Sequence, residues 1–138
     1  YYELERYKGK LASFLNDFMR NHKDLIVWQK SMKLVKDLYQ ITQVFPKEEI
    51  YGITSQMRRA AVSIPSIIAE GYGRGHDKEL IQFLYISLGS ASELETQLII
   101  CNDIHYLSTQ SFEELNSLNN EIIRMLSSLI NKRNILPC

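Results

Sequence analysis

Cysteine is scarce in this chain, and neither of its two cysteines has a close partner. Cys101 and Cys138 stand far apart and no CxxC pair occurs, so we expect reduced thiols without a disulfide framework or a zinc site. Long apolar runs are also missing, since no stretch approaches the roughly 18 to 20 residues that a membrane span requires. The N-terminal segment carries charges where a signal peptide needs an apolar core. These absences predict a cytoplasmic protein without a membrane partner.

Catalytic and metal-binding patterns are absent as well. No glutamate is followed three residues later by histidine, the spacing used by di-iron helical bundles, and no HExxH segment occurs. The histidines His22, His76 and His105 are scattered along the chain. The run GYGRGH departs from GxGxxG and follows a predicted helix instead of a strand, which disfavours a dinucleotide site. We therefore expect no enzyme activity, no cofactor and no small-molecule substrate.

The residues that are present fit one packed domain with an uneven charge distribution. Hydrophobic residues make up 45% of the 138 positions, an ordinary share for a globular core. The net charge is zero, yet residues 1–78 carry 13 basic against 9 acidic side chains, and residues 79–138 carry 3 against 7. The basic half predicts a face that attracts phosphates, a face that meets the acidic half of a neighbouring subunit, or ordinary solvated charge.

Apolar residues at steps of three and four predict a first amphipathic helix between Asp24 and Phe45. Asp24 is the expected N-cap, and Pro46 lies just past the end. The expected main buried stripe consists of Leu25, Trp28, Met32, Val35, Tyr39 and Thr42. A second set widens this stripe and consists of Val27, Leu34, Leu38, Ile41 and Phe45.

A second helix is predicted over residues 54–72. Pro65 lies inside it and removes a backbone donor, so we expect a kink or a short break near Ser63 and Ile64. The run GYGRGHD then ends the helix, because its three glycines supply the left-handed backbone that a helix end and a chain reversal require.

The third helix, predicted over residues 78–102 with Asp77 as its N-cap, carries more apolar surface than one stripe. Its expected core face consists of Leu80, Phe83, Leu84, Ser87, Ala91, Leu94, Leu98 and Cys101. Beyond that face lie Ile81, Leu88, Ile99 and Ile100, and the run SLGSAS allows close approach of another backbone. A four-helix protomer has no internal partner left for a second face, so the surplus predicts self-association, with a broad core face as the alternative. The subunit-interface candidates are Glu70, Ser87, Leu88, Gly89, Ser90 and Ala91.

A fourth helix is predicted from Ser108 or Ser111 to about Lys132, since Ser111 and Glu114 match a capping box. Its expected core positions are Phe112, Leu115, Leu118, Ile122, Met125, Leu126 and Leu129. The expected polar face consists of Glu113, Glu114, Asn116, Asn119, Asn120, Glu121 and Ser128.

The domain organisation predicted from these patterns is an all-α four-helix bundle over residues 22–133, with an N-terminal extension at 1–21 and a tail at 134–138. Apolar residues at helical spacing also occur within 1–18. The extension is a fifth helix, a leader from another reading frame or an engineered fusion, and the sequence leaves these alternatives open.

Four basic residues are the candidates for an anion or nucleic-acid surface: Arg58, Arg59, Arg74 and Lys78. Guanidinium groups match the geometry of phosphates, and neutralising phosphates releases counterions. The alternative is structural: one arginine pairs with Glu70 and another with Glu93 or Glu95, between helices or between subunits.

Several segments of the chain resemble the family of bacterial four-helix bundle proteins encoded in 23S rRNA intervening sequences. The likeness covers about residues 22–132, and its motifs follow one another in the family's order. One position departs, since the family's usual I-P-S-N has Ile67 in place of asparagine. The matching segments are DLIVWQKS (24–31), EEIYGITSQMRRAAVSIPSIIAEGYGRG (48–75), KELIQFLYISLGSASELETQL (78–98) and IHYL (104–107).

This resemblance implies an antiparallel up-down-up-down bundle and ring-like homopentamers. One branch of the family, the accessory proteins of diversity-generating retroelements, looks like a basic barrel that binds a reverse transcriptase and nucleic acid. We therefore expect a non-enzymatic oligomeric bundle whose partners are copies of itself and RNA, DNA or a reverse transcriptase. The alternative is a purely structural or partner-regulating oligomer without nucleic-acid contact.

Overall fold

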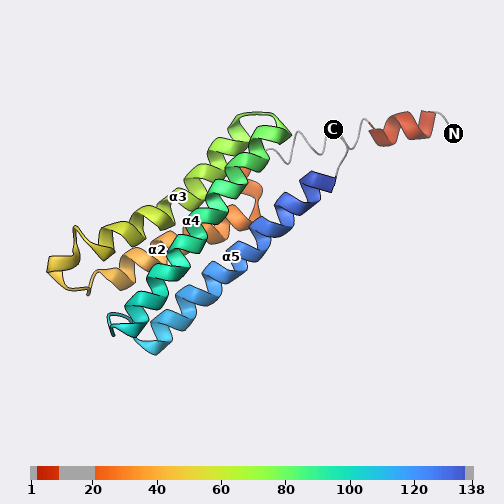
Figure 1. The fold of residues 1–138 in the computed structure, drawn as a ribbon. Helices are drawn as coiled ribbons and strands as arrows, with labels where there is room; N and C mark the ends of the chain where they lie inside the picture. The colour runs from red at the N-terminus through yellow and green to blue at the C-terminus, as the bar shows by residue number, and fades with distance from the viewer. Residues whose placement is uncertain (1–2, 10–20, 136–138) are drawn as a thin grey trace.

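The computed structural model describes residues 3–9 and 21–135, and every regular element within them is a helix (Figure 1). Residues 3–9 are helical, whereas the rest of the N-terminal pattern and residues 136–138 of the predicted tail lie outside the described residues. No described helix combines the length and apolar character that crossing a membrane demands. The elements of the domain are η1 (His22–Asp24), α2 (Ile26–Thr42), η2 (Lys47–Glu49), α3 (Ile53–Gly73), α4 (Asp77–Asp103) and α5 (Thr109–Ile135).

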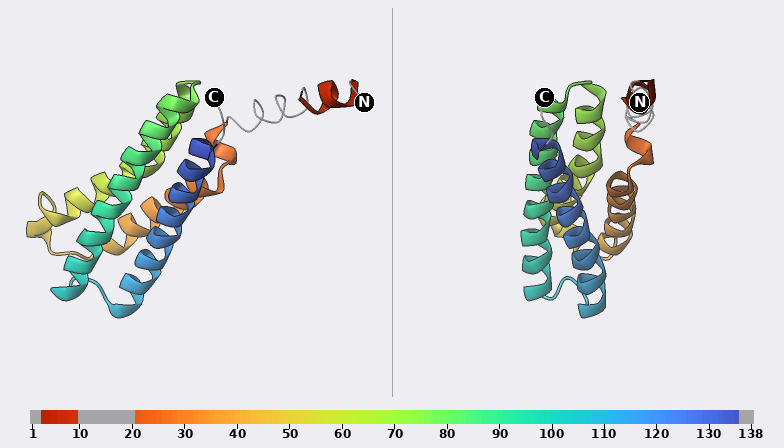
Figure 2. Two further views of the ribbon diagram at one scale, coloured as in Figure 1. Left: turned by 45° about the vertical axis from the view of Figure 1, so that its right-hand side comes forward. Right: turned by 90° about the vertical axis from the view of Figure 1, so that its right-hand side faces the viewer.

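The four long helices form a four-helix bundle around one core. Each helix packs against two others, so that α2, α3, α4 and α5 close a cycle of contacts (Figure 2). The Sγ of Cys101 lies 3.5 Å from the Sδ of Met57, and Phe83 lies against Gly71, so α3 and α4 run antiparallel. The largest fully buried side chains are Leu34, Leu38, Met57, Ile64, Ile68, Leu84, Leu94, Leu98, Leu115, Ile122, Leu126 and Ile130.

The face of α2 that points into the core differs from the predicted one. Its buried residues are Val27, Ser31, Leu34, Leu38 and Thr42. Met32 and Tyr39, expected in the main stripe, are 45% and 39% exposed, and Thr42 alone of that stripe is fully buried. Ser31 and Thr42 tolerate burial because their hydroxyls donate to carbonyls one turn earlier, at 2.6 and 2.7 Å. Because a polar residue occupies a core position, the apolar pattern of the sequence did not identify the buried face of α2.

Two of the predicted helix caps are wrong by one residue each. Asp24 belongs to η1 instead of capping α2, and Asp77 lies in the first turn of α4. An acid in the first turn still interacts favourably with the helix dipole, so composition alone does not separate this position from the N-cap. At α5 the first of the two predicted starts is correct, because the Oγ of Ser108 accepts a 3.0 Å hydrogen bond from the backbone N–H of Ser111.

α3 runs unbroken through Pro65, so the break predicted near Ser63 and Ile64 does not occur. Proline inside a helix typically costs about 3 kcal/mol, because a backbone donor is lost and the ring crowds the preceding turn. Here Pro65 and Ile64 are buried in the core, and the Ser63 hydroxyl donates to the carbonyl of Ala60 at 2.7 Å. Burial and this local hydrogen bond therefore hold the helical conformation.

Asn119 lies in the core, although the sequence pattern placed it on the polar face of α5. Its Nδ2 donates to the carbonyl of Ala91 at 2.9 Å, while its buried Oδ1 has no hydrogen-bond partner among the described residues. Nearer the end of α5, Arg133 pairs with Asp77 at 2.6 Å. These contacts show that α4 and α5 also run antiparallel, so the predicted antiparallel order is seen directly at two helix pairs.

Gly71 is expected to resist enlargement, whereas Gly73 in the same helix is not. A Cβ at Gly71 would lie 2.7 Å from the Cβ of Phe83, while one at Gly73 would meet nothing within 4 Å. Gly71→Ala should therefore lower the free energy of unfolding by about 1–3 kcal/mol. Gly73→Ala should be neutral or slightly stabilising, and equal urea midpoints for the two variants would contradict this account of the α3–α4 contact.

Asn119→Asp should destabilise the bundle strongly at neutral pH. The change keeps the shape of the side chain, removes the donor to Ala91 and buries a carboxylate, so we expect a loss of at least about 2 kcal/mol at pH 7. Burial raises the pKa of such a carboxyl in the folded state, so the loss should shrink as the pH falls toward 4. Chemical denaturation at both pH values measures the effect, with Asn120→Asp as the control at a half-buried neighbour.

Candidate functional site

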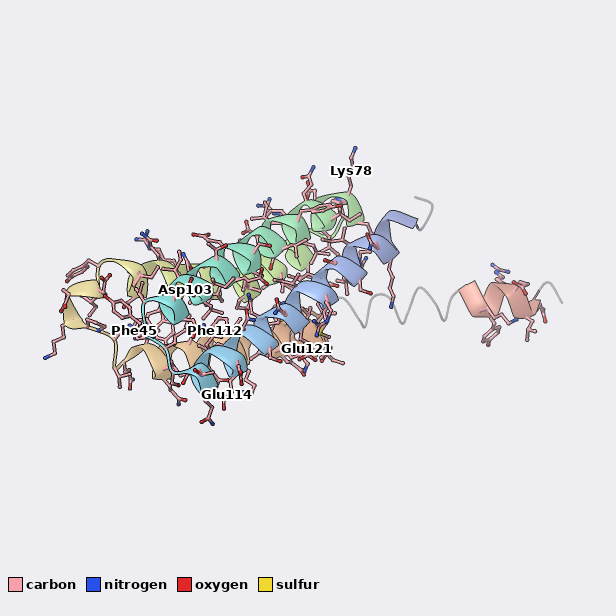
Figure 3. The ribbon with its side chains drawn as sticks, turned by 60° about the horizontal axis from the view of Figure 1, so that its bottom comes forward. Phe45, Lys78, Asp103, Phe112, Glu114 and Glu121 are labelled. Carbon is pink, nitrogen blue, oxygen red and sulfur yellow. The ribbon has the colours of Figure 1, made fainter. Side chains whose placement is uncertain are left out.

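The four predicted basic residues fall into two separate groups. Arg58 and Arg59 lie in the first third of α3, whereas Arg74 follows its last residue and Lys78 lies in the first turn of α4. Sixteen residues of helix separate Arg58 from Arg74, a distance of about 24 Å along the axis. Figure 3 shows Lys78 at the end of the bundle opposite Phe45. A single chain therefore does not bring the four residues together in one patch.

Arg58 is held within the chain by the end of α2. Its Nε donates to the Oγ1 of Thr42 at 3.0 Å, and its Nη2 donates to the carbonyl of Tyr39 at 3.4 Å. The guanidinium also lies over the ring of Tyr39, 4.5 Å from its centroid. A cation at the C-terminal turn of a helix satisfies free carbonyls and the helix dipole, so Arg58 stabilises the α2–α3 packing.

Arg74 also has partners within the chain. Its Nη2 lies 3.1 Å from the Oε1 of Glu70, and its guanidinium lies 5.2 Å from the centroid of the Phe83 ring. The sequence left open a pairing of an arginine with Glu70 between helices or subunits; the observed pair instead joins two residues four apart at the end of α3. Glu70 itself is 53% exposed at its side chain, so this interaction is a surface ion pair worth at most about 1 kcal/mol.

Two grooves on the outer surface adjoin each other beside Arg59. The first has a volume of about 490 Å³, and its lining includes Tyr39, Ile50, Arg58, Arg59, Val62 and Ser66. The second has a volume of about 360 Å³ and is lined by Gln56, Arg59, Ala60, Ser63 and Glu93. The second groove lies between α3 and α4, because Glu93 is its one lining residue from α4. Sequence reasoning did not find these grooves, since their walls come from segments far apart in the chain.

The outer face of α4 continues this surface with exposed isoleucines. Ile86 and Ile100 are 53% and 44% exposed, and their spacing places them on one side of α4 together with Gly89 and Glu93. Ile104, which is 48% exposed, directly follows the last residue of the helix. A Cβ at Gly89 would meet nothing within 4 Å, so the surface there is open. We call this combination of the second groove and the isoleucine stripe the α3–α4 outer face.

Two of the six predicted interface residues lie in the core. Ser87 and Ala91 are fully buried within the chain, where the Ser87 hydroxyl donates to the carbonyl of Ile64 at 3.0 Å. Their small side chains therefore serve the packing of α4 inside the protomer and offer no surface to a second copy. Gly89 is exposed, and Leu88 and Ser90 are half-buried.

The described residues offer little for catalysis. Within 3–9 and 21–135, no group of three histidine, cysteine, aspartate or glutamate side chains is placed to hold a metal ion. Burial raises the pKa of the Cys101 thiol to about 11, and the charge of Glu49 adds to the shift. The thiol therefore stays protonated at neutral pH and lacks the character of a nucleophile. What the surface does provide is apolar area beside isolated charges, a combination suited to binding.

Comparison with known proteins agrees with the resemblance seen in the sequence. A family model described as 23S rRNA-intervening sequence protein matches residues 23–128. The fold is similar to the crystal structure of a protein with unknown function from the S23 ribosomal protein family of Bacteroides thetaiotaomicron, with a TM-score of 0.68 and 25% sequence identity. That similarity covers 76% of this chain and 98% of the other. No curated protein matches. The chain belongs to the 23S rRNA-intervening sequence protein family.

Proposed function

We propose that this protein is a non-enzymatic scaffold that assembles into a homo-oligomer through the α3–α4 outer face. The observation that carries the proposal is the pair Ile86 and Ile100, each about half exposed on the side of α4 that borders the groove beside Arg59. Exposed apolar side chains gathered on one face of a soluble protein mark an interaction surface. Removing one half-exposed isoleucine from water contributes about 1 kcal/mol, so several copies of the stripe together favour association.

The size of the assembly follows from the family resemblance, which predicts five copies in a ring. A ring requires that each copy use two different patches, one for each neighbour. The α3–α4 outer face is broad enough to contribute such patches, since it includes both the groove beside Arg59 and the isoleucine stripe. We therefore propose a homopentamer as the working form.

The assembly state tests this proposal directly. Native mass spectrometry or light scattering at micromolar concentration should give about five times the 16.1 kDa mass of one chain. Ile86→Glu combined with Ile100→Glu should reduce the mass to that of one chain without changing the helical circular dichroism, because charge replaces the apolar contact.

The matched control is Ile26→Glu, since Ile26 is 58% exposed but lies on α2, which does not pack against α4. This variant should keep the mass of the wild type. A wild-type mass of one chain at micromolar concentration would reject the proposal.

Nucleic-acid binding is a second candidate function, favoured by two exposed cations. Arg59 and Lys78 are exposed and form no ion pair within the described part of the chain. Here Arg59 faces the nucleic acid and not a second copy, so this function is an alternative to assembly through the α3–α4 outer face. Exposed cations attract the phosphates of a nucleic acid. A reverse transcriptase, the protein partner that the resemblance implies, stays a prediction.

RNA binding should appear as retention of single-stranded or structured RNA that weakens steeply with salt, measured by fluorescence anisotropy. Arg59→Ala combined with Lys78→Ala should weaken it at least about tenfold at low salt, since each lost phosphate contact removes released counterions. Lys33→Ala is the control, because Lys33 is paired with Asp37 at 2.5 Å. Absence of retention at low salt would leave the scaffold alone as the function.

A further inference from the structure

The groove between α3 and α4 carries one charge of each sign. Arg59 lies on its α3 wall and Glu93 on its α4 wall, and both side chains are exposed. Neither residue belongs to any ion pair found among residues 3–9 and 21–135, although both line the same groove. The one polar contact of the Glu93 carboxylate is a 3.3 Å hydrogen bond from the Nε2 of Gln97. The face therefore holds a cation and an anion that are both available to a partner.

The other charged side chains near this face form hydrogen bonds within the chain or point to another side of their helix. Arg58 donates to Thr42 and to the end of α2. Glu95 is half-buried and lies two residues from Glu93, so it points to a different side of α4. Arg59 and Glu93 are thus the two groups whose charge this groove presents.

The mixed sign of the groove decides which occupant fits it. A nucleic acid or an acidic peptide would be attracted by Arg59 and repelled by Glu93, and a basic peptide would meet the opposite combination. In a ring of copies of this chain, the neighbour on one side brings a glutamate for the arginine, and the neighbour on the other side brings an arginine for the glutamate. The groove floor is formed by Ala60 and Ser63, whose small side chains allow close approach.

We propose that Arg59 of one copy forms an ion pair with Glu93 of the adjoining copy across the α3–α4 outer face. This inference rests on the proposed self-association and names the contact that sets its register. Burial of the isoleucine stripe favours association but does not select one relative orientation of the two copies, since the hydrophobic effect is non-directional and proportional to the buried area. A charge pair at one point of the face penalises every docking in which like charges meet, so it selects one arrangement. Arginine suits this role because its planar fork binds a carboxylate at two points.

Charge reversal tests the pair. Arg59→Glu and Glu93→Arg, each alone, place like charges opposite each other and should reduce the mass in solution to that of one chain. The two changes combined in one chain restore opposite charges and should restore the assembly. Native mass spectrometry measures the mass of each variant, and circular dichroism verifies that each variant is folded.

The controls make the same charge changes away from this face. Lys36→Glu on α2 and Glu113→Arg on α5 alter exposed residues and should leave the mass unchanged. If both single reversals keep the assembly while Ile86→Glu with Ile100→Glu disrupts it, the ion pair is overturned and the scaffold stands. If the single reversals dissociate the assembly but the combined variant does not restore it, the pairing is also overturned. If the wild type is a single chain, the proposed function fails before this test is reached.

Discussion

The close packing of α3 against α4 is the constraint on which the rest of the structure depends. Three contacts fix this pair along its length: Gly71 against Phe83, the Ser87 hydroxyl on the carbonyl of Ile64, and the sulfur atoms of Met57 and Cys101. Small side chains at these positions bring the two backbones close together. Because the inner faces of both helices are used in this packing, their outer faces together form one surface, and the groove lined by Arg59 and Glu93 lies on it.

Part of this fold could be predicted from the sequence, and the errors have a common cause. The helices, the turn at GYGRGHD and most of the α4 core face follow from periodicity, and Gly75 has the positive φ of 76° that such a turn requires. The wrong face of α2 and the wrong placement of Asn119 both arose from polar residues in the core. Ser31 and Asn119 are buried with hydrogen bonds to backbone carbonyls, and a hydropathy pattern does not contain those acceptors.

The candidate site was less predictable than the fold, because its partners are distant in sequence. The basic residues singled out from the sequence differ in their surroundings, since Arg58 donates to Thr42, sixteen residues earlier, and holds the end of α2. Arg59 stands next to it in the chain and yet points to solvent. Adjacent residues on a helix differ in direction by about 100°. Of two neighbouring arginines, one can therefore pack within the chain while the other points to solvent. A motif therefore locates such residues without assigning their roles.

The opposite net charges of the two halves of the chain partly neutralise each other within the bundle. Lys30 on α2 pairs with Glu121 on α5 at 2.8 Å, so part of the basic first half is neutralised by the acidic second half inside one bundle. Arg74 is paired with Glu70 in its own segment. Part of the charge of the basic half is thus neutralised within the protomer. At the α3–α4 outer face the groove is lined by one arginine and one glutamate beside exposed isoleucines, a composition that supports the proposed contact between copies.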